Sequence, residues 1–311
     1  MNSIKPIYLA PLQGYTNVFY RRALNEVYSV VDKYFTPFFE EEKDSFSDPQ
    51  LLPELDQVIN AGCVLVPQVA SNNSKFLIDF TQKVSKLGFD EVNINMGCPF
   101  PMLVKRQKGG GMLSEPYLVE QLLSDFFSKD LHVRLSIKMR AGLNHSDQGL
   151  EILQVLNKFP IHEIIIHPRL VTQKYNGQPN WIDFERMFDN THIPLVANGD
   201  LITNDDIQDI YNRFPDIKAV MLGRGMLRDP SIINLLDEKQ KGERFRLFHQ
   251  VYFDLVMKNA LNWNQAFNYF NDFWFYPLSS STEGKRHFRK LKKYNNIESY
   301  KDWINPAFDL I

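Results

Sequence analysis

The chain has 311 residues, enough for one large domain with a small one or for two domains of moderate size. Its content of 44% apolar, 23% charged and 13% aromatic residues is typical of a packed globular protein and excludes an intrinsically disordered one. A formal net charge of −2 argues against a uniformly basic nucleic-acid-binding surface, and the presence of only two cysteines excludes a disulfide scaffold.

Short apolar runs alternate with helix-length amphipathic segments over roughly the first 235 residues. The runs predict eight strands, at residues 7–9, 32–35, 64–68, 91–95, 134–138, 163–167, 194–198 and 219–222. The segments between them predict helices at residues 18–28, 74–87, 116–127, 150–158 and 204–214. This alternation favours an α/β fold, a TIM (β/α)8 barrel, whose typical size is about 250 residues. A doubly wound open sheet is the alternative, but no G-x-G-x-x-G follows the first strand.

The sequence changes character after about Glu238. Aromatic residues at helical spacing over 245–260 and 263–275, followed by residues 282–294, predict a small all-helical C-terminal domain. Residues 241–311 carry 11 Lys and Arg against 7 Asp and Glu, a net charge of +4, whereas the residues before them carry 24 against 30, a net charge of −6. We therefore expect a barrel domain over residues 1–237 and a basic helical domain over residues 238–311.

Polar residues and glycines gather where the predicted strands end. In a TIM barrel the carboxyl ends of all strands meet at one rim, and active sites are built on that rim. The strand-end residues are Ala10 to Gly14, Gln68, Asn95 to Pro99, Lys138 to Arg140, His167 to Arg169, Asn198 to Asp200 and Gly223 to Gly225. The sequence thus predicts a functional site on this rim.

Two glycine-containing turns predict a phosphate site. Asn198-Gly199-Asp200 ends the seventh strand, and Gly223-Arg224-Gly225 ends the eighth. Glycine lets backbone N–H groups approach an anion closely, and Arg224 can add a charge-assisted hydrogen bond. The loops after strands seven and eight commonly bind phosphate in TIM barrels. The alternative is a pair of tight turns with a surface arginine.

Lys138 and His167, at the ends of the fifth and sixth strands, predict an anionic partner on the rim. A partly desolvated ammonium needs such a partner, because burying an unpaired charge is costly. A flavin fits, since an ammonium beside its N1–C2 edge stabilises the reduced, anionic ring. His167 can donate to the same ring or to a phosphate, although a lone histidine is more often structural.

Cys98 lies in an Asn-Met-Gly-Cys-Pro-Phe-Pro turn that we expect to expose its thiol at the rim. A thiol beside a flavin can deliver a proton to carbon while hydride arrives on the opposite face. We expect the run 109–111 of three glycines to let this loop open and close. Cys63 precedes a buried strand and is predicted to be a core residue; a turn cysteine without a role is the alternative for Cys98.

Basic residues cluster in two places, around the Cys98 turn and in the tail. Lys105, Arg106 and Lys108 follow the turn, and the tail cluster comprises Lys285, Arg286, His287, Arg289, Lys290, Lys292 and Lys293. Such runs are usually solvated faces. A second basic element beside a catalytic loop indicates a phosphate-backbone partner instead.

Six strings resemble the tRNA-dihydrouridine synthase family, in the right order over about residues 6–235. They begin at Ala10, Val92, Lys138, Ile166, Val196 and Met221, and the second contains the specific N-x-N-M-G-C-P motif. The resemblance implies a TIM barrel that binds FMN, with a helical RNA-binding domain after it. It also implies that NADPH reduces the FMN and that the flavin passes hydride to C6 of a uracil in tRNA.

The resemblance further implies roles for individual residues. Cys98 would be the general acid that protonates C5, and Asn95 would hold the flipped uracil. The cofactor would be bound by Pro11, Leu12, Gln68, Lys138, His167, Asn198, Gly199, Asp200, Gly223 and Arg224. The RNA would be bound by Lys105, Arg106, Arg140, Arg169, Arg286, Arg289 and Lys290.

Three positions depart from the family pattern. Asn17 stands where aspartate is common, Pro168 replaces a usual glycine, and residues 36–38 replace a more acidic stretch. The tail is also short for the family. None of these departures affects Cys98, Lys138 or the glycine turns.

Other functions remain open at the level of sequence. A flavin barrel could reduce a free small molecule, the RNA could be ribosomal, or the barrel could bind RNA without catalysis. The apolar stretch after Met1 is too short for a signal peptide, no run approaches the roughly 20 residues of a membrane span, and no Cys/His spacing resembles a zinc site. We expect a cytoplasmic monomer without membrane or metal partners.

Overall fold

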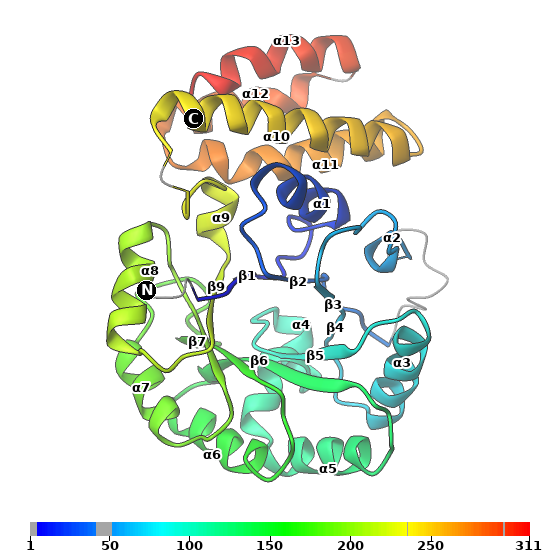
Figure 1. Cartoon of the computed structure of the whole chain (residues 1–311), viewed down its shortest axis with the longest axis vertical. Helices are drawn as coiled ribbons and strands as arrows, with labels where there is room; N and C mark the ends of the chain where they lie inside the picture. Colours follow the sequence, from blue (N-terminus) through cyan, green and yellow to red (C-terminus); the bar gives the residue numbers. More distant parts are fainter. Residues whose placement is uncertain (1–4, 42–51, 235, 295) are drawn as a thin grey trace.

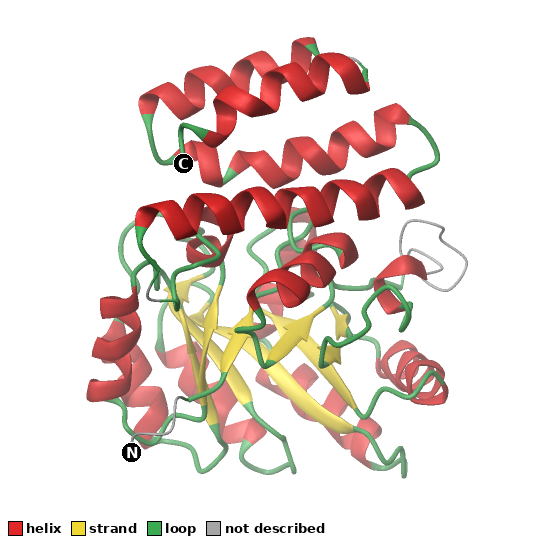
Figure 2. Ribbon diagram, turned by 45° about the horizontal axis from the view of Figure 1, so that its top comes forward, coloured by secondary structure: helices red, strands yellow, loops and turns green. Residues whose placement is uncertain are grey.

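A computed structural model describes residues 5–41, 52–234, 236–294 and 296–311. Nine parallel strands form one sheet in the order β3-β2-β1-β9-β8-β7-β6-β5-β4. The strands are β1 Ile7–Leu9, β2 Lys33–Phe35, β3 Leu65–Val66, β4 Gln68–Val69, β5 Glu91–Met96, β6 Arg134–Gly142, β7 Ile164–Leu170, β8 Leu195–Asn198 and β9 Ala219–Leu222. The predicted TIM barrel followed by a helical region is confirmed (Figures 1 and 2).

The predicted strand at residues 64–68 is divided by the structure at Pro67 into β3 and β4, whereas the other predicted strands differ at most in their bounds. Proline has no N–H to donate to a neighbouring strand, so the ladder breaks there. β3 pairs with β2 and β4 pairs with β5. The two halves are separated by Pro67 alone, so the barrel closes through this interrupted third strand.

Helices surround the strands, as Figure 2 shows. They are α1 Val18–Tyr28, α2 Leu52–Leu55, α3 Ser74–Lys86, α4 Pro101–Lys105, α5 Pro116–Phe127, α6 Asp147–Leu156, α7 Trp181–Asp189, α8 Asn204–Arg213 and α9 Arg224–Arg228, with a 3-10 helix η1 at Gly109–Ser114. Asn17 caps α1, because its side-chain oxygen accepts from the backbone N–H groups of Phe19 and Tyr20. Asparagine and aspartate are both favoured N-cap residues, so Asn17 still caps the helix although it departs from the family pattern.

Inward-pointing side chains divide the barrel interior into an apolar and a polar half. The apolar half is formed by Tyr8, Ala10, Phe35, Val66, Ile165, Val196, Ala219 and Met221. The polar half lies at β4, β5 and β6, where Gln68, Asn93, Asn95 and Ser136 form hydrogen bonds with one another. Below them, near the amino ends of the strands, the Lys33 ammonium lies 2.9 Å from carboxylates of both Glu91 and Glu163.

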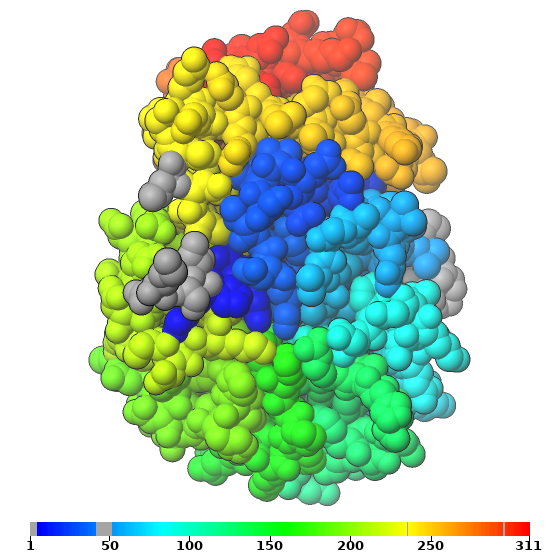
Figure 3. Space-filling view, in the orientation of Figure 1, coloured from blue at the N-terminus to red at the C-terminus, as the bar shows by residue number. Residues whose placement is uncertain are grey.

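The C-terminal region packs tightly on the first helix of the barrel. It consists of α10 Glu238–Asn259, α11 Trp263–Phe275, η2 Pro277–Ser279, α12 Thr282–Lys290, η3 Leu291–Lys293 and α13 Ile297–Phe308. The ring of Phe248 on α10 lies 5.2 Å from that of Tyr20 and 5.6 Å from that of Tyr28, between ring centroids. In Figure 3 the blue N-terminal segment lies directly against the yellow and orange helices. Both parts therefore contribute to one continuous hydrophobic core.

No helix in the part of the chain that the structure describes is both long and apolar enough to cross a bilayer.

Candidate active site

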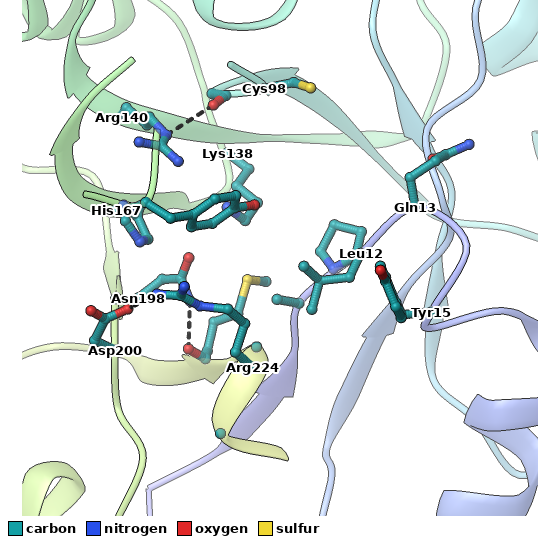
Figure 4. Close-up of a pocket in the computed structure, with 18 of the residues that line it drawn as sticks. Leu12, Gln13, Tyr15, Cys98, Lys138, Arg140, His167, Asn198, Asp200 and Arg224 are labelled. Carbon is teal, nitrogen blue, oxygen red and sulfur yellow. Dashed lines mark hydrogen bonds and ion pairs between the residues drawn. The ribbon is translucent and has the colours of Figure 1, made fainter. Parts of the chain in front are cut away.

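A cavity of about 400 Å³ opens at the carboxyl ends of the strands. Its wall contains residues from the ends of β1, β5, β6, β7, β8 and β9, as well as Phe38 and three tyrosines. The predicted residues that line it are Pro11, Leu12, Asn95, Cys98, Lys138, Arg140, His167, Asn198, Gly199, Asp200, Gly223 and Arg224. In the view of Figure 4, Cys98 lies at one end of this pocket and Arg224 near the other, with Lys138 between them.

The Cys98 turn is held by the side chain of Asn95. The Asn95 oxygen accepts from the backbone N–H groups of Gly97 at 3.0 Å and Cys98 at 2.9 Å. The thiol is half-buried, not exposed as the sequence predicts, because η1 covers the turn. Burial raises the pKa of the Cys98 thiol, and the nearby Lys138 only partly offsets this effect. The thiol is therefore protonated at neutral pH, the state that a proton donor requires.

The three glycines of η1 allow this element to pack closely against the Cys98 turn and its neighbours. The N–H of Gly110 donates to the carbonyl of Cys98 at 3.0 Å. A Cβ at Gly110 would lie 2.5 Å from a methyl group of Val171, and one at Gly111 would lie 2.5 Å from the carbonyl oxygen of Val104. In this structure the run is a buried element packed against the Cys98 turn.

Lys138 and His167 lie in the pocket wall without protein acceptors. In the described part of the chain the Lys138 ammonium has no hydrogen-bond partner, and burial together with Arg140 lowers its pKa to about 8. The buried Nδ1 atom of His167 also has no partner. Burial and four neighbouring cations hold the pKa of His167 well below its usual range, so its ring is neutral. Both groups can donate hydrogen bonds to a ligand.

Arg140 is committed to the protein backbone. Its guanidinium donates to the carbonyl of Gly97 at 3.1 Å, to that of Leu170 at 2.9 Å and to that of Lys174 at 2.6 Å. It therefore joins the Cys98 turn to the loop after β7, and the electrostatic field of this fixed cation adds to that of Lys138.

Asp200 lies between two arginines at the other end of the pocket. It forms ion pairs with Arg169 and with Arg224. Although burial opposes ionisation, these two pairs lower the pKa of Asp200. Gly199 beside it has φ +140°, a conformation that side chains rarely adopt, so the turn needs a glycine there.

The remaining predicted residues lie away from the cavity wall. Gln68 is fully buried beneath it, and Arg169 is buried behind Asp200. Lys105 and Arg106 are exposed at the end of α4, next to the Cys98 turn. Arg286, Arg289 and Lys290 are exposed on α12 in the C-terminal region.

Sequence reasoning missed four aromatic residues of the pocket, Tyr15, Phe38, Tyr175 and Tyr276. Tyr15 lies within the family-like string that begins at Ala10, so the sequence could have identified it. Tyr175 follows β7, and its ring lies 4.6 Å from the Arg224 guanidinium. Tyr276 comes from the end of α11, packed edge-on against Tyr15 at 4.9 Å, and no local pattern marks it.

The comparison with known families decides the identity of this barrel. A model of the family described as dihydrouridine synthase matches residues 8–270. The chain belongs to the dihydrouridine synthase family. The match covers the barrel together with α10 and most of α11, so the family's common region extends past the predicted boundary at residue 237.

Several curated tRNA-dihydrouridine synthases are similar to the chain at 25–27% identity. It is 27% identical to the tRNA-dihydrouridine(16) synthase of Pseudomonas syringae pv. tomato, over 76% of each chain. It is 25% identical to that of Neisseria meningitidis serogroup A, over 76% of this chain and 72% of that protein. It is also 26% identical to tRNA-dihydrouridine synthase B of Pasteurella multocida, but over 48% of this chain and 45% of that protein.

Solved structures share the barrel at low sequence identity. An old yellow enzyme homologue from Zymomonas mobilis has a TM-score of 0.51 at 13% identity, covering 73% of this chain and 86% of that one. Histamine dehydrogenase from Rhizobium sp. 4-9 has a TM-score of 0.56 at 11% identity, covering 79% of this chain and 48% of that one. These likenesses describe the fold alone.

The pocket of this family member fits a flavin that carries a phosphate. The unpartnered Lys138 ammonium and the unpartnered Nδ1 of His167 suit an electron-rich ring edge, and Arg224 beside the glycine turns suits a phosphate. The described residues contain no group of three or more His, Cys, Asp or Glu side chains that could hold a metal ion.

Proposed function

We propose that the protein reduces uridine to 5,6-dihydrouridine in tRNA, with FMN as cofactor and NADPH as reductant. The observation that carries the proposal is the combination of a protonated, half-buried thiol with unpartnered cationic and neutral donors in one pocket. Membership of the dihydrouridine synthase family and the names of the similar proteins support it.

Bound FMN supplies the hydride for C6 of the uracil. Lys138 and His167 bind the flavin ring, with Pro11 and Leu12 packing against it. Arg224 and the turns formed by Asn198, Gly199 and Asp200 and by Gly223 hold its phosphate end, while the Asp200 carboxylate itself pairs with Arg169 and Arg224. Gln68 is the remaining residue assigned to the flavin. Its side-chain amide is fully buried beneath the pocket and accepts a hydrogen bond from Asn95, so it supports the flavin site from below.

Cys98 delivers the proton to C5 of the uracil, and Asn95 holds the base after it has left its stack. The raised pKa of the thiol keeps the proton on sulfur until the carbon becomes basic. The fixed guanidinium of Arg140 positions the turn that carries this thiol.

The RNA is bound by basic side chains outside the pocket. Lys105 beside the Cys98 turn and Arg286, Arg289 and Lys290 on α12 are exposed and have no ion pair with a carboxylate among the described residues. Arg106, next to Lys105, is also exposed. Arg169 supports the site through Asp200. A free small molecule as substrate would require none of these cations, which favours the RNA.

Mapping of dihydrouridine in cellular RNA tests the proposal. We expect tRNA from cells without the gene to lack one dihydrouridine by mass spectrometry and the wild-type gene, but not Cys98→Ala, to restore it. Ribosomal RNA from the same cells is mapped in parallel. Unchanged dihydrouridine in tRNA, or a loss confined to ribosomal RNA, would contradict the proposed substrate.

NADPH as the particular reductant, a monomeric state and a cytoplasmic location belong to the same proposal and rest on the sequence. Initial rates with NADPH and NADH, together with light scattering of the purified chain, test the first two.

A further inference from the structure

A chain of hydrogen-bonded side chains runs through the barrel interior beneath the pocket. The Asn95 amide donates to Gln68 at 2.9 Å, Gln68 donates to Asn93 at 2.8 Å, and Asn93 donates to the Ser136 hydroxyl at 2.9 Å. Ser136 donates to a carboxylate oxygen of Glu91 at 2.7 Å, where the chain ends. Asn95 is 8% exposed and the other four residues are at most 1% exposed.

Both ends of this chain require the same direction of donation. At the upper end, the backbone N–H groups of Gly97 and Cys98 can only donate, so the Asn95 oxygen must face them. Its NH₂ group must then face Gln68. At the lower end, the Glu91 carboxylate can only accept, and its other oxygen accepts from Lys33 at 2.9 Å.

Among the described residues, the side-chain amides of Asn95, Gln68 and Asn93 have only the hydrogen-bond partners named above. The opposite half of the interior is apolar, with Phe35, Val66 and Ile165 among its members. If one amide turned over, two donors or two acceptors would face each other in a buried site, which is costly. One orientation of Asn95 is therefore fixed by residues on its own strand β5 and on the neighbouring strands β4 and β6, none of which lines the pocket.

We propose that Ser136, Asn93 and Gln68 are positioning residues for Cys98. They lock the amide of Asn95, and the Asn95 oxygen in turn holds the backbone of the turn that carries the thiol. The catalytic meaning of this position rests on the proposed function, in which the thiol protonates the uracil. The position itself is a property of the protein without ligands and is measured separately.

Two variants of matched size test the proposal. Ser136→Thr keeps the hydroxyl group and Ser136→Val removes it, while both add the same volume to the interior. Ser136→Ala removes the hydroxyl group without adding volume, in case both larger side chains impair folding. Ile165→Val removes one methyl group from the apolar half and controls for a general loosening of the barrel.

The first readout is the rate at which iodoacetamide alkylates Cys98 in the full chain without flavin or RNA, followed by peptide mass spectrometry. Cys63, whose thiol donates to the carbonyl of Arg21 at 3.7 Å and takes no part in the chain of amides, is the internal reference in the same sample. We expect Ser136→Val and Ser136→Ala to speed alkylation of Cys98 at least threefold relative to Ser136→Thr, with Cys63 and Ile165→Val unchanged. Equal Cys98 rates in the Val, Ala and Thr variants, or parallel increases at both cysteines, would overturn the proposal.

The second readout is catalytic. We expect Ser136→Val to lower kcat for uridine reduction about tenfold relative to Ser136→Thr, with an unchanged KM for RNA and an unchanged rate of flavin reduction by NADPH. If the wild-type protein forms no dihydrouridine, the proposed function fails, and the alkylation ratio still decides the positioning claim. A kcat that is the same in the Val and Thr variants overturns the catalytic part of the claim.

Discussion

At the scale of single residues, the site depends on Cys98 and Lys138, and burial controls the protonation state of both side chains. The Cys98 thiol is kept protonated and the Lys138 ammonium is made easier to deprotonate, because burial disfavours the charged form of each. A protonated thiol suits a donor. The charged form of Lys138, which burial disfavours, would be stabilised by an anionic ligand beside it.

Cys98→Ala is expected to separate the two half-reactions. Reduction of bound flavin by NADPH does not involve the thiol and should proceed at the wild-type rate. Transfer to uridine should slow by about 100-fold or more, the usual contribution of a general acid. Stopped-flow absorbance follows both steps, and Cys63→Ala is the matched control. Wild-type turnover in Cys98→Ala would refute the role of the thiol.

The lowered pKa of Lys138 predicts a pH-dependent affinity for FMN. Below about pH 8 the amine is charged in both the empty and the occupied pocket, so affinity is at its maximum. As pH rises through about 8, the empty pocket loses the positive charge that strengthens the hydrogen bond from Lys138 to the flavin ring, so affinity should fall. Flavin fluorescence titrations between about pH 7 and pH 9 measure this, and Lys138→Met should bind weakly without that pH dependence. A rise in wild-type affinity over this range would contradict the assignment.

Much of the pocket could be predicted because strand ends of a barrel converge. Asn95, Cys98, Lys138 and His167 are found by that rule alone. Tyr276 could not be found, since a residue from the tail reaches the pocket only through tertiary packing. Nor could the ion pair of Arg169 with Asp200, which turns a predicted RNA contact into an internal one.

At the scale of secondary-structure elements, periodicity located the strands and most helices. Residues 18–28, 116–127 and 263–275 are helices with the predicted bounds. The helices α7 and α13 were missed: α7 has only nine residues, and α13 contains Pro306, a residue that usually ends a helix. The alternation of Glu91, Asn93 and Asn95 on β5 was visible in the sequence, but its inward direction needs the closed barrel.

The helix α12 divides its two faces between the core and a cation-rich surface. Its end packs on α13, where the rings of His287 and Trp303 stack at 4.7 Å. Lys285, Arg286, Arg289 and Lys290 are exposed, and no ion pair with a carboxylate is found for them among the described residues. Such a surface binds phosphates by releasing counterions.

Charge reversal on α12 should weaken RNA binding. We expect the combined substitutions Arg286→Glu, Arg289→Glu and Lys290→Glu to lower tRNA affinity by roughly tenfold or more and to flatten the salt dependence of that affinity. Reversal of three exposed lysines outside α12, Lys86, Lys129 and Lys239, gives the same change in net charge and is the control. Filter binding across salt concentrations measures both sets. Equal effects of the two sets would assign the α12 cations to the solvated surface.

At the scale of the whole molecule, the barrel and the helical region share one hydrophobic core through α1 and α10. The two parts still differ in charge, with a net −6 before residue 241 and +4 from residue 241 onward, which suits catalysis in the barrel and RNA binding by the helical region. Their packing predicts that they unfold together, even though the sequence divides them at residue 237.

Phe248→Ala should therefore destabilise the entire chain. Loss of a buried phenylalanine costs about 3–5 kcal/mol, and Phe248 packs on both Tyr20 and Tyr28. In urea we expect one transition, shifted to lower concentration, with the same midpoint by circular dichroism and by tryptophan fluorescence. Two separate transitions, with only the second part affected, would show that the helical region folds by itself.

The most direct test of the account is the mass of a substrate after reaction with the purified chain. The chain is loaded with FMN, supplied with NADPH and incubated with tRNA transcribed without modifications. The account predicts that a uridine gains two hydrogens in a reaction that Cys98→Ala does not support. An unchanged tRNA mass, while the same flavin is reduced by NADPH and reoxidised by a small enone, would contradict it.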